Sequence, residues 1–233
     1  MLTQIKSSFA PLVAAPARGL IRLGLTPNAV TLGALAISLA LCGLLAWTKA
    51  VLVLVPLLGL SLLLDALDGP VARLSGRVSK TGAYLDALCD RVSDGALCLA
   101  LAAATGHWKL YFVVALGAGL FSYAKARAEM EAPIGNEAWP DLMERTERCA
   151  ALLISAFAYA LFPNWSAAGL DVLDWALALL AALIWASVIQ RVLRAVDWLE
   201  RVDDPTKPAR SPKASGPAGV RAPRARGLAG RRS

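Results

Sequence analysis

Long apolar stretches separated by short polar segments make up most of this 233-residue chain. The stretch from Leu23 to Thr48 carries no charged residue, and neither does the stretch from Cys149 to Leu170. A helix that crosses a lipid bilayer needs roughly 20 consecutive, mostly apolar residues. The pattern therefore predicts spanning helices at residues 27–48, 50–74, 82–105, 109–129, 147–163 and 171–198.

The segment that precedes the first predicted span is amphipathic. Apolar residues recur at helical spacing over residues 7–23, with Arg18 and Arg22 nearby, which is typical of a helix lying in the membrane interface. Thr26 can then cap the first spanning helix, and Pro27 suits its first turn. We therefore expect an all-α integral membrane protein, a six-transmembrane-helix bundle with an N-terminal interfacial helix.

Basic residues predict the orientation in the membrane. With six spans, the loops on one side contain only Lys49 and Lys109, whereas both termini and the basic loops share the other side. Positively charged loops favour the cytoplasmic side, so we expect a multi-pass protein of the cell (plasma or inner) membrane with both termini and the active site facing the cytoplasm. The expected organisation is a juxtamembrane segment at 1–26, a membrane domain at 27–200 and a tail at 201–233.

The basic tail is rich in proline, glycine and arginine, and the net charge of the chain is +7. Such a segment buries too little apolar surface to fold alone, so we expect it to be disordered and to contact anionic lipid. No aromatic residues alternate with its basic residues as base stacking would require, so a nucleic-acid partner is not expected.

Cysteine and histidine exclude several kinds of site. The chain is 57% apolar and has four cysteines, none of them in a CxxC pair, so neither a disulfide framework nor a cysteine zinc site is expected. Its single histidine, His107, argues against a histidine-rich metal site and a Ser-His-Asp triad. We interpret His107 as a polar residue at the membrane interface.

Aspartates interrupt the second and third predicted spans. Asp65 and Asp68 share one helix face, and Asp86, Asp90 and Asp94 recur every fourth residue. If the two acidic faces meet, their carboxylates repel one another unless cations stabilise them. All-oxygen ligands suit Mg²⁺ or Mn²⁺, and two such ions beside an arginine would match a diphosphate. A proton-coupled or ion transporter, or ion pairs within the bundle, would also explain aspartates between helices.

The same residues closely resemble a known family. Asp65-x2-Asp68-Gly69-x2-Ala72-Arg73-x8-Gly82-x3-Asp86-x3-Asp90 matches every fixed position of the CDP-alcohol phosphotransferase signature. These enzymes move a phosphatidyl-type group from a CDP-linked lipid to an alcohol and release CMP. The resemblance implies that two divalent cations, Mg²⁺ or Mn²⁺, are held by Asp65, Asp68, Asp86 and Asp90. It also implies that Asp90 is the catalytic base that accepts the proton of the acceptor hydroxyl.

The resemblance further assigns a binding site for the CDP lipid and suggests a homodimer. The small residues of the signature would let the nucleotide approach the backbone, and an arginine would contact the diphosphate. The implied residues are Asn28, Thr31, Gly69, Arg73, Ser79 and Gly82.

Basic residues of the last three spans bear on the acceptor alcohol. The stretches LDALCDRVSDG, SYAKARAE and ERTER resemble phosphatidylinositol phosphate synthases, which transfer the phosphatidyl group of CDP-diacylglycerol to inositol 1-phosphate. The resemblance implies that the acceptor phosphate is held by Lys125, Arg148 and Arg191, with Arg127 and Arg145 nearby. Solvated loop charge is the alternative interpretation of these residues. Glycerol 3-phosphate is another possible acceptor, although family members that use it usually have the motif LDPxADK where this chain has LDALCDR. Two further alternatives stay open: an archaeal-type CDP lipid as the donor, and a non-catalytic scaffold.

Overall fold

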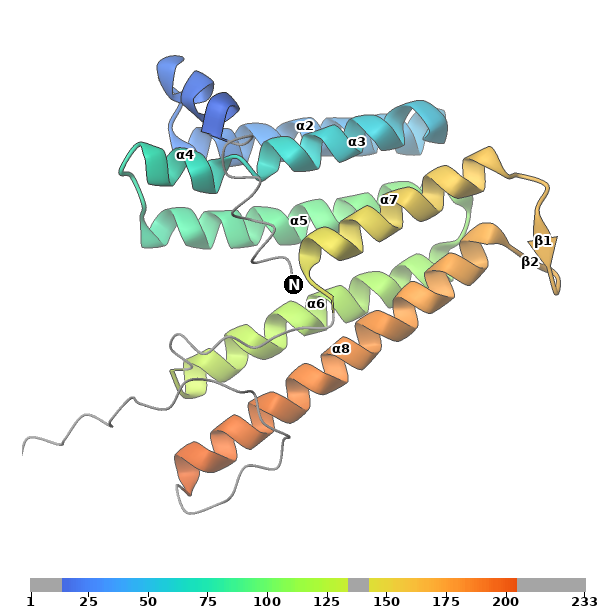
Figure 1. Cartoon of the computed structure of the whole chain (residues 1–233). Coiled ribbons are helices and arrows are strands. Elements are labelled where there is room, and N and C mark those ends of the chain that lie inside the picture. Colours follow the sequence, from blue (N-terminus) through green and yellow to red (C-terminus); the bar gives the residue numbers. More distant parts are fainter. Residues whose placement is uncertain (1–13, 134–142, 205–233) are drawn as a thin grey trace, which may run out of the picture.

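A computed structural model describes residues 14–133 and 143–204, which form a bundle of long helices (Figure 1). Residues 14–22 are helical and precede the named elements. The order along the chain is α2 (Pro27–Thr48), α3 (Val51–Asp65), α4 (Asp68–Leu74), α5 (Lys80–Thr105), α6 (Trp108–Glu131), α7 (Arg145–Leu161), β1 (Ser166–Ala167), β2 (Leu170–Asp171) and α8 (Val172–Asp203).

The helix ends follow the local sequence signals. Thr26 caps α2 by accepting a hydrogen bond from the Ala29 amide at 3.3 Å, and α2 has the predicted bounds. Ser79 caps α5 in the same way, because its hydroxyl oxygen accepts from the Gly82 amide at 2.9 Å. Side-chain caps satisfy backbone N–H groups that the first helical turn leaves without partners.

The helix predicted over residues 50–74 is not continuous, which corrects the sequence prediction. It divides into α3 and α4, with Ala66 and Leu67 between them. Pro70 has no N–H to donate to the Ala66 carbonyl, and it lies in the first turn of α4, where a helix tolerates proline best. The chain therefore begins a new helix at Asp68, and the break places Asp65 and Asp68 on different elements.

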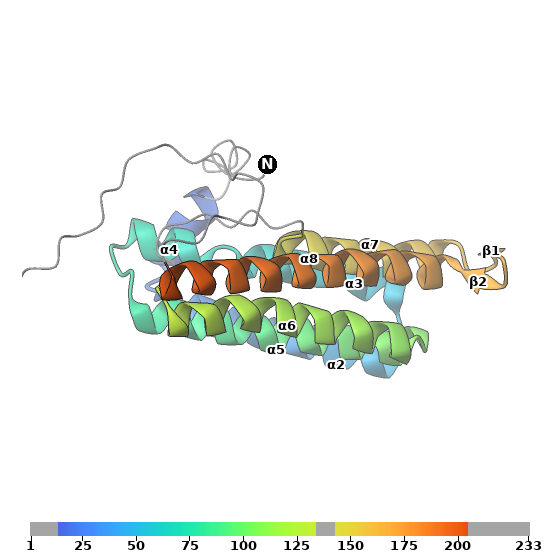
Figure 2. The same ribbon diagram turned by 90° about the horizontal axis from the view of Figure 1, so that it is seen from below.

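The long helices pack side by side in two layers. One layer holds α3, α7 and α8, and the other holds α2, α5 and α6 (Figure 2). The most extensive contacts join α6 to α8 and α2 to α5. A methyl group on Gly117 of α6 would lie 2.7 Å from Ile184 Cγ2 of α8, so only glycine allows these two helices to approach so closely.

Apolar side chains fill the centre of the bundle and also cover its outside. Leu45, Leu101 and Leu173 are fully buried, whereas Leu99 and Leu193 are exposed on the outer faces. Among the described residues, Pro27–Thr48, Val51–Leu74 and Val172–Asp203 are long and apolar enough to cross a membrane. These features agree with the predicted all-α membrane class.

The described part of the N-terminal segment packs against the protein. Ala17 is buried together with Val30 of α2, Val71 of α4 and Leu67, which precedes α4. The first part of the predicted interfacial helix, residues 7–13, lies outside the described residues, as does nearly all of the predicted basic tail.

Candidate active site

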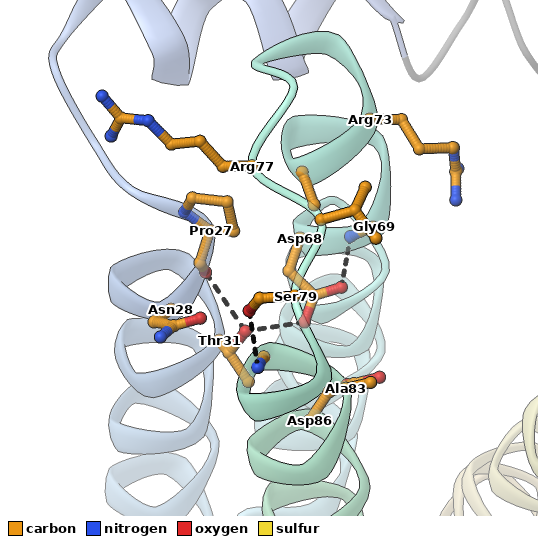
Figure 3. A pocket seen from close by; sticks show the side chains of 13 residues that line it. Pro27, Asn28, Thr31, Asp68, Gly69, Arg73, Arg77, Ser79, Ala83 and Asp86 are labelled. Atoms are coloured by element: carbon orange, nitrogen blue, oxygen red, sulfur yellow. Dashed lines mark hydrogen bonds between the residues drawn. The ribbon is translucent and has the colours of Figure 1, made fainter. Parts of the chain in front are cut away.

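A cavity of about 300 Å³ lies between α4 and the first turns of α2 and α5 (Figure 3). Every residue predicted to bind the CDP lipid lines this cavity, together with two of the signature aspartates. The lining residues are Pro27, Asn28, Thr31, Asp68, Gly69, Ala72, Arg73, Arg77, Val78, Ser79, Gly82, Ala83 and Asp86.

Asp68 is held in place on the floor of the cavity. The Thr31 hydroxyl of α2 donates to Asp68 Oδ2 at 2.7 Å, and the Gly69 amide donates to Asp68 Oδ1. The break before α4 makes this possible, because Asp68 begins the new helix beside α2. One carboxylate of the signature thus connects α4 to α2.

Gly82 allows α2 and α5 to approach each other beside the cavity. A methyl group on Gly82 would lie 3.1 Å from Ser79 Oγ and 3.3 Å from Asn28 Oδ1. Both distances are tighter than ordinary van der Waals contact, so a larger residue would press on the α5 cap and on Asn28. The glycine of the signature therefore has a local packing role.

Two arginines stand at the rim of the cavity. Arg73 of α4 and Arg77 of the following loop direct their guanidinium groups to opposite sides (Figure 3). Arg77 is not among the predicted site residues. The sequence marks Arg77 only as a basic residue in the short loop between two helices that carry aspartates.

A second group of carboxylates surrounds Arg145 at the beginning of α7. Arg145 Nη1 lies 3.0 Å from Asp65 Oδ2 and 2.7 Å from Asp90 Oδ1, and Arg145 Nε donates to Asp94 Oδ1 at 2.9 Å. Asp94 also is not among the predicted site residues, although it continues the four-residue spacing of Asp86 and Asp90. The guanidinium of Arg145, predicted to lie near the acceptor phosphate, is thus held by three aspartates.

The carboxylates of the signature fit a hard divalent cation by their chemistry. Asp86 lies near both Asp68 and Asp65, so their negative charges act on one another. Asp90 Oδ1 is buried and accepts no hydrogen bond from the described residues, despite its short distance to Arg145. Carboxylate oxygens gathered in this way are the ligands that Mg²⁺ or Mn²⁺ prefers.

The structure places two of the predicted acceptor-site arginines on one aromatic ring. The guanidinium carbon of Arg191 lies 3.4 Å from the centre of the Phe121 ring, and that of Arg148 lies 4.9 Å from it. Arg191 Nη1 also donates to the Phe121 carbonyl at 2.8 Å. Both arginines are buried, and three different helices supply the group. Phe121 is not among the predicted site residues, because nothing in its local sequence marks it.

The other two predicted acceptor-site residues lie on α6. Arg127 is half exposed and forms an ion pair with Glu131 one turn later. Lys125 is half buried on the same helix. The structure thus brings Arg148 and Arg191 together, whereas Arg127 has a partner of its own.

A smaller cavity of about 220 Å³ separates α3 from α7. Asp65 and Arg145 line it beside apolar residues such as Leu62 and Leu153. An apolar cavity that borders the acidic group is suited to a molecule with a hydrocarbon part and a charged part.

Comparison with known proteins identifies similar chains. The sequence model of the CDP-alcohol phosphatidyltransferase family matches residues 24–193. An archaetidylinositol phosphate synthase of Pyrococcus horikoshii is 32% identical over 86% of this chain and 99% of its own length. A phosphatidylinositol phosphate synthase of Corynebacterium glutamicum is 34% identical over 77% of this chain and 81% of its own length.

Solved structures have a similar fold. The phosphatidylinositol phosphate synthase of Mycobacterium tuberculosis with CDP-DAG bound superposes with a TM-score of 0.67 and 31% identity, over 79% of this chain and 94% of that one. Its complex with manganese and citrate has the same TM-score, over 88% of that chain.

Proposed function

This chain belongs to the CDP-alcohol phosphatidyltransferase family, and on that premise we propose that it transfers the phosphatidyl group of CDP-diacylglycerol to inositol 1-phosphate. The products are phosphatidylinositol phosphate and CMP. The observation that carries the proposal is the cavity in which all residues expected to bind a CDP lipid meet Asp68 and Asp86. Relatives named for bacterial and for archaeal lipids both make inositol phosphate lipids, which supports the same acceptor here.

The CDP group of the donor binds in the cavity at the beginning of α2, α4 and α5. Asn28, Thr31, Gly69, Ser79 and Gly82 surround the nucleotide, and Gly69 leaves room beside the backbone for it. Arg73 at the rim attracts the diphosphate, because its planar group can donate to two phosphate oxygens.

Asp65, Asp68, Asp86 and Asp90 would hold the divalent cations. When bound, Mg²⁺ or Mn²⁺ stabilises the negative charge of the diphosphate and of the departing CMP. Asp68 is already oriented by Thr31 and the Gly69 amide. Arg145 supplies a fixed positive charge beside Asp65 and Asp90, which keeps these carboxylates close together.

Asp90 acts as the base. Its Oδ1 forms an ion pair with Arg145 Nη1 at 2.7 Å, and an ionised carboxylate has further lone pairs that can accept a proton. Asp90 takes the proton of an inositol hydroxyl, and that oxygen forms a bond to the phosphorus that carries diacylglycerol. The bond from this phosphorus to the oxygen bridging to CMP breaks, and CMP leaves with the bonding electrons.

The acceptor phosphate is held by Arg148 and Arg191, with Lys125 beside them. Burial of two arginines side by side is costly, and an anion between them would offset their repulsion. Phe121 holds both groups at one place through its ring. Arg127 and Arg145 are the further basic residues of the proposed acceptor site, and in the structure each is paired with acidic side chains.

The protein is a multi-pass protein of the cell membrane with six spans. The candidate spans are Pro27–Thr48, Val51–Leu74 and Val172–Asp203, and the remaining three are α5, α6 and α7, whose charged residues belong to the site. Both termini and the active site face the cytoplasm, residues 1–26 form an interfacial segment, residues 27–200 the membrane domain, and residues 201–233 a disordered basic tail. A homodimer is the proposed assembly.

The test is an assay of CMP release by the purified protein with CDP-diacylglycerol and Mn²⁺ or Mg²⁺. Inositol 1-phosphate, glycerol 3-phosphate, inositol and serine are compared as acceptors, and an archaeal-type CDP lipid is compared as donor. We expect release with inositol 1-phosphate alone. Release with glycerol 3-phosphate alone would refute the acceptor, and no release with any pair would refute the transferase and favour an ion or proton-coupled transporter.

A further inference from the structure

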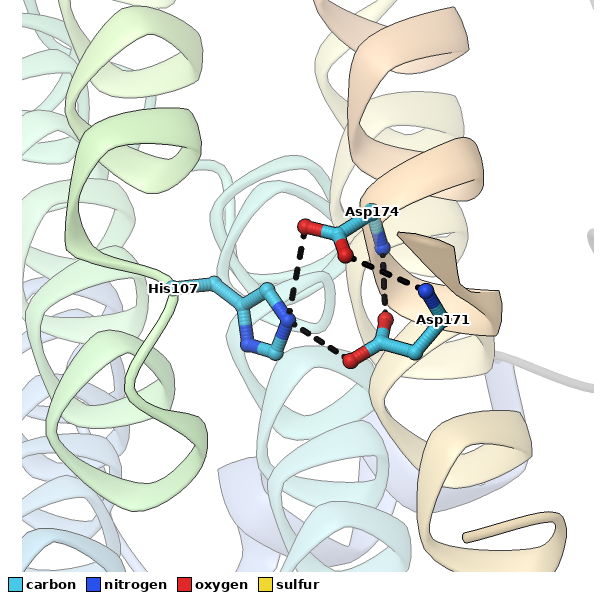
Figure 4. A group of neighbouring side chains, drawn as sticks. All are labelled: His107, Asp171 and Asp174. Atoms are coloured by element: carbon cyan, nitrogen blue, oxygen red, sulfur yellow. Dashed lines mark hydrogen bonds and ion pairs between the residues drawn. The ribbon is translucent and has the colours of Figure 1, made fainter. Parts of the chain in front are cut away.

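One histidine and two aspartates meet at the end of the bundle opposite to the nucleotide cavity (Figures 1 and 4). His107 lies in the turn between α5 and α6, and Asp171 and Asp174 lie at the beginning of α8. His107 Nε2 is 3.0 Å from Asp171 Oδ2 and 3.6 Å from Asp174 Oδ1. Among the described residues, these three side chains are a group of possible metal ligands whose atoms all lie within 4.8 Å of one another.

The hydrogen bond on the other side of the imidazole determines which nitrogen is available. His107 Nδ1 lies 3.1 Å from the Thr105 carbonyl oxygen. A carbonyl oxygen only accepts, so Nδ1 carries a proton and donates it. Nε2 then faces two carboxylate oxygens, which also only accept. Nε2 must therefore bind either a second proton or a metal ion, and metal-bound histidines generally donate their other N–H to a carbonyl or carboxylate in this way.

The two carboxylates are held in position by the cap of α8. Asp171 Oδ1 accepts from the amides of Leu173 and Asp174, each at 2.8 Å. Asp174 Oδ2 accepts from the Asp171 amide at 3.1 Å. Each aspartate thus uses one oxygen for the cap and directs the other toward His107 (Figure 4).

Charge also favours a cation at this position. Among the described residues, the basic side chain within ion-pair distance of the Asp171 and Asp174 carboxylates is that of His107. A single imidazolium would neutralise only one of the two negative charges, whereas a divalent ion would neutralise both.

The separations of the donor atoms from His107 Nε2 are within about 0.3 Å of those around a small tetrahedral ion. Zinc bonds to nitrogen and to carboxylate oxygen of about 2.0–2.2 Å imply ligand-to-ligand distances of about 3.3–3.5 Å. The observed 3.0 Å and 3.6 Å lie on either side of that range. An imidazole nitrogen with carboxylates selects ions such as Zn²⁺ over Mg²⁺. The side chains of His107, Asp171 and Asp174 are 13%, 28% and 26% exposed, so the group is open to an ion from outside.

We propose that His107, Asp171 and Asp174 form a second metal site, for a divalent transition metal such as Zn²⁺, separate from the metals of the transfer reaction. Three ligands come from the chain, and the fourth position is left to water. The ion connects the α5–α6 turn to the beginning of α8. It thereby joins the layer of α5 and α6 to the layer of α8 at the end of the bundle distant from the nucleotide.

The test uses the fact that the chain has a single histidine. Full-length protein, purified through a tag without histidine and labelled with ¹⁵N/¹³C-histidine, has one imidazole signal to follow by NMR. Zn²⁺ is added in the presence of excess Mg²⁺, which occupies the aspartates of the transfer site. We expect the signal to change until about one equivalent is bound and then to become insensitive to pH near neutrality. We also expect the melting temperature to rise with Zn²⁺.

Variants separate the two metal sites. Asp174→Asn keeps an oxygen for the Asp171 amide but removes one charged ligand, so Zn²⁺ affinity should fall by at least about tenfold. Asp90→Asn alters only the transfer site and should leave the zinc response of the imidazole unchanged. An imidazole signal that titrates with pH and ignores millimolar Zn²⁺ would overturn the proposal and leave an ion pair. A zinc response lost in Asp90→Asn would overturn it as well.

Discussion

Phe121 allows the acceptor pocket to be tested without removing any charge. Phe121→Leu keeps an apolar side chain in the core but removes the ring that lies 3.4 Å from the guanidinium carbon of Arg191 and 4.9 Å from that of Arg148. The bond from Arg191 to the Phe121 carbonyl, at 2.8 Å, is made by the backbone and remains. The substitution therefore loosens the two arginines without removing either.

The expected loss follows from the contacts that disappear. A desolvated cation–π contact contributes about 2 kcal/mol and a more distant one less, while the remaining backbone bond retains part of the alignment. We expect a net loss of about 1–2 kcal/mol in acceptor binding, which corresponds to a rise of about 5- to 30-fold in the KM for inositol 1-phosphate.

The assay is CMP release at varied concentrations of each substrate. The KM for CDP-diacylglycerol should stay within about twofold of the original value, because Phe121 does not line the nucleotide cavity. Phe112→Leu is the matched control, since Phe112 lies on the same helix with 67% of its surface exposed and should change neither constant. Equal increases in both KM values, or an unchanged acceptor KM, would refute the proposed role of the two arginines.

Three further predictions concern the base, the metals and the packing of the bundle. Asp90→Asn should lower turnover by at least about 100-fold, the low end for loss of a general base, while CDP-lipid binding persists, and near-normal CMP release would contradict its role. Chelation with EDTA should abolish CMP release, and Mg²⁺ or Mn²⁺ should restore it; release that survives chelation would refute the metal requirement. Gly117→Ala should lower the free energy of unfolding by about 1–3 kcal/mol in thermal denaturation, because its methyl group would meet Ile184. Gly119→Ala is its control, since nothing lies within 4 Å of that position, and an equal effect in both variants would show that packing is not the cause.

Local signals in the sequence were sufficient for much of the architecture. Thr26 and Pro27 predicted the beginning of α2, and Lys49, which adopts a left-handed conformation at its end, follows the last predicted residue. The break between α3 and α4 was missed because residues 50–74 satisfy a length and hydropathy criterion without interruption. Pro70 is the signal that could have located it.

The sequence by itself indicated the residues that line the cavity between α2, α4 and α5, through the resemblance of the signature to a known family, because most of these residues lie on short consecutive elements. The signature from Asp65 to Asp90 spans only α3, α4, a loop and the first turns of α5, so its residues stay close together, although the break between α3 and α4 puts Asp65 and Asp68 on different elements. Pro27, Asn28 and Thr31 come from elsewhere, at the beginning of α2.

The tertiary structure alone decided the contacts between distant helices. Helical periodicity defines which residues share a face, but the rotation and register of two helices depend on how their side chains interlock. For that reason the positions of Arg145 among the aspartates, of Phe121 between two arginines, and of His107 beside Asp171 and Asp174 became visible only in the packed bundle.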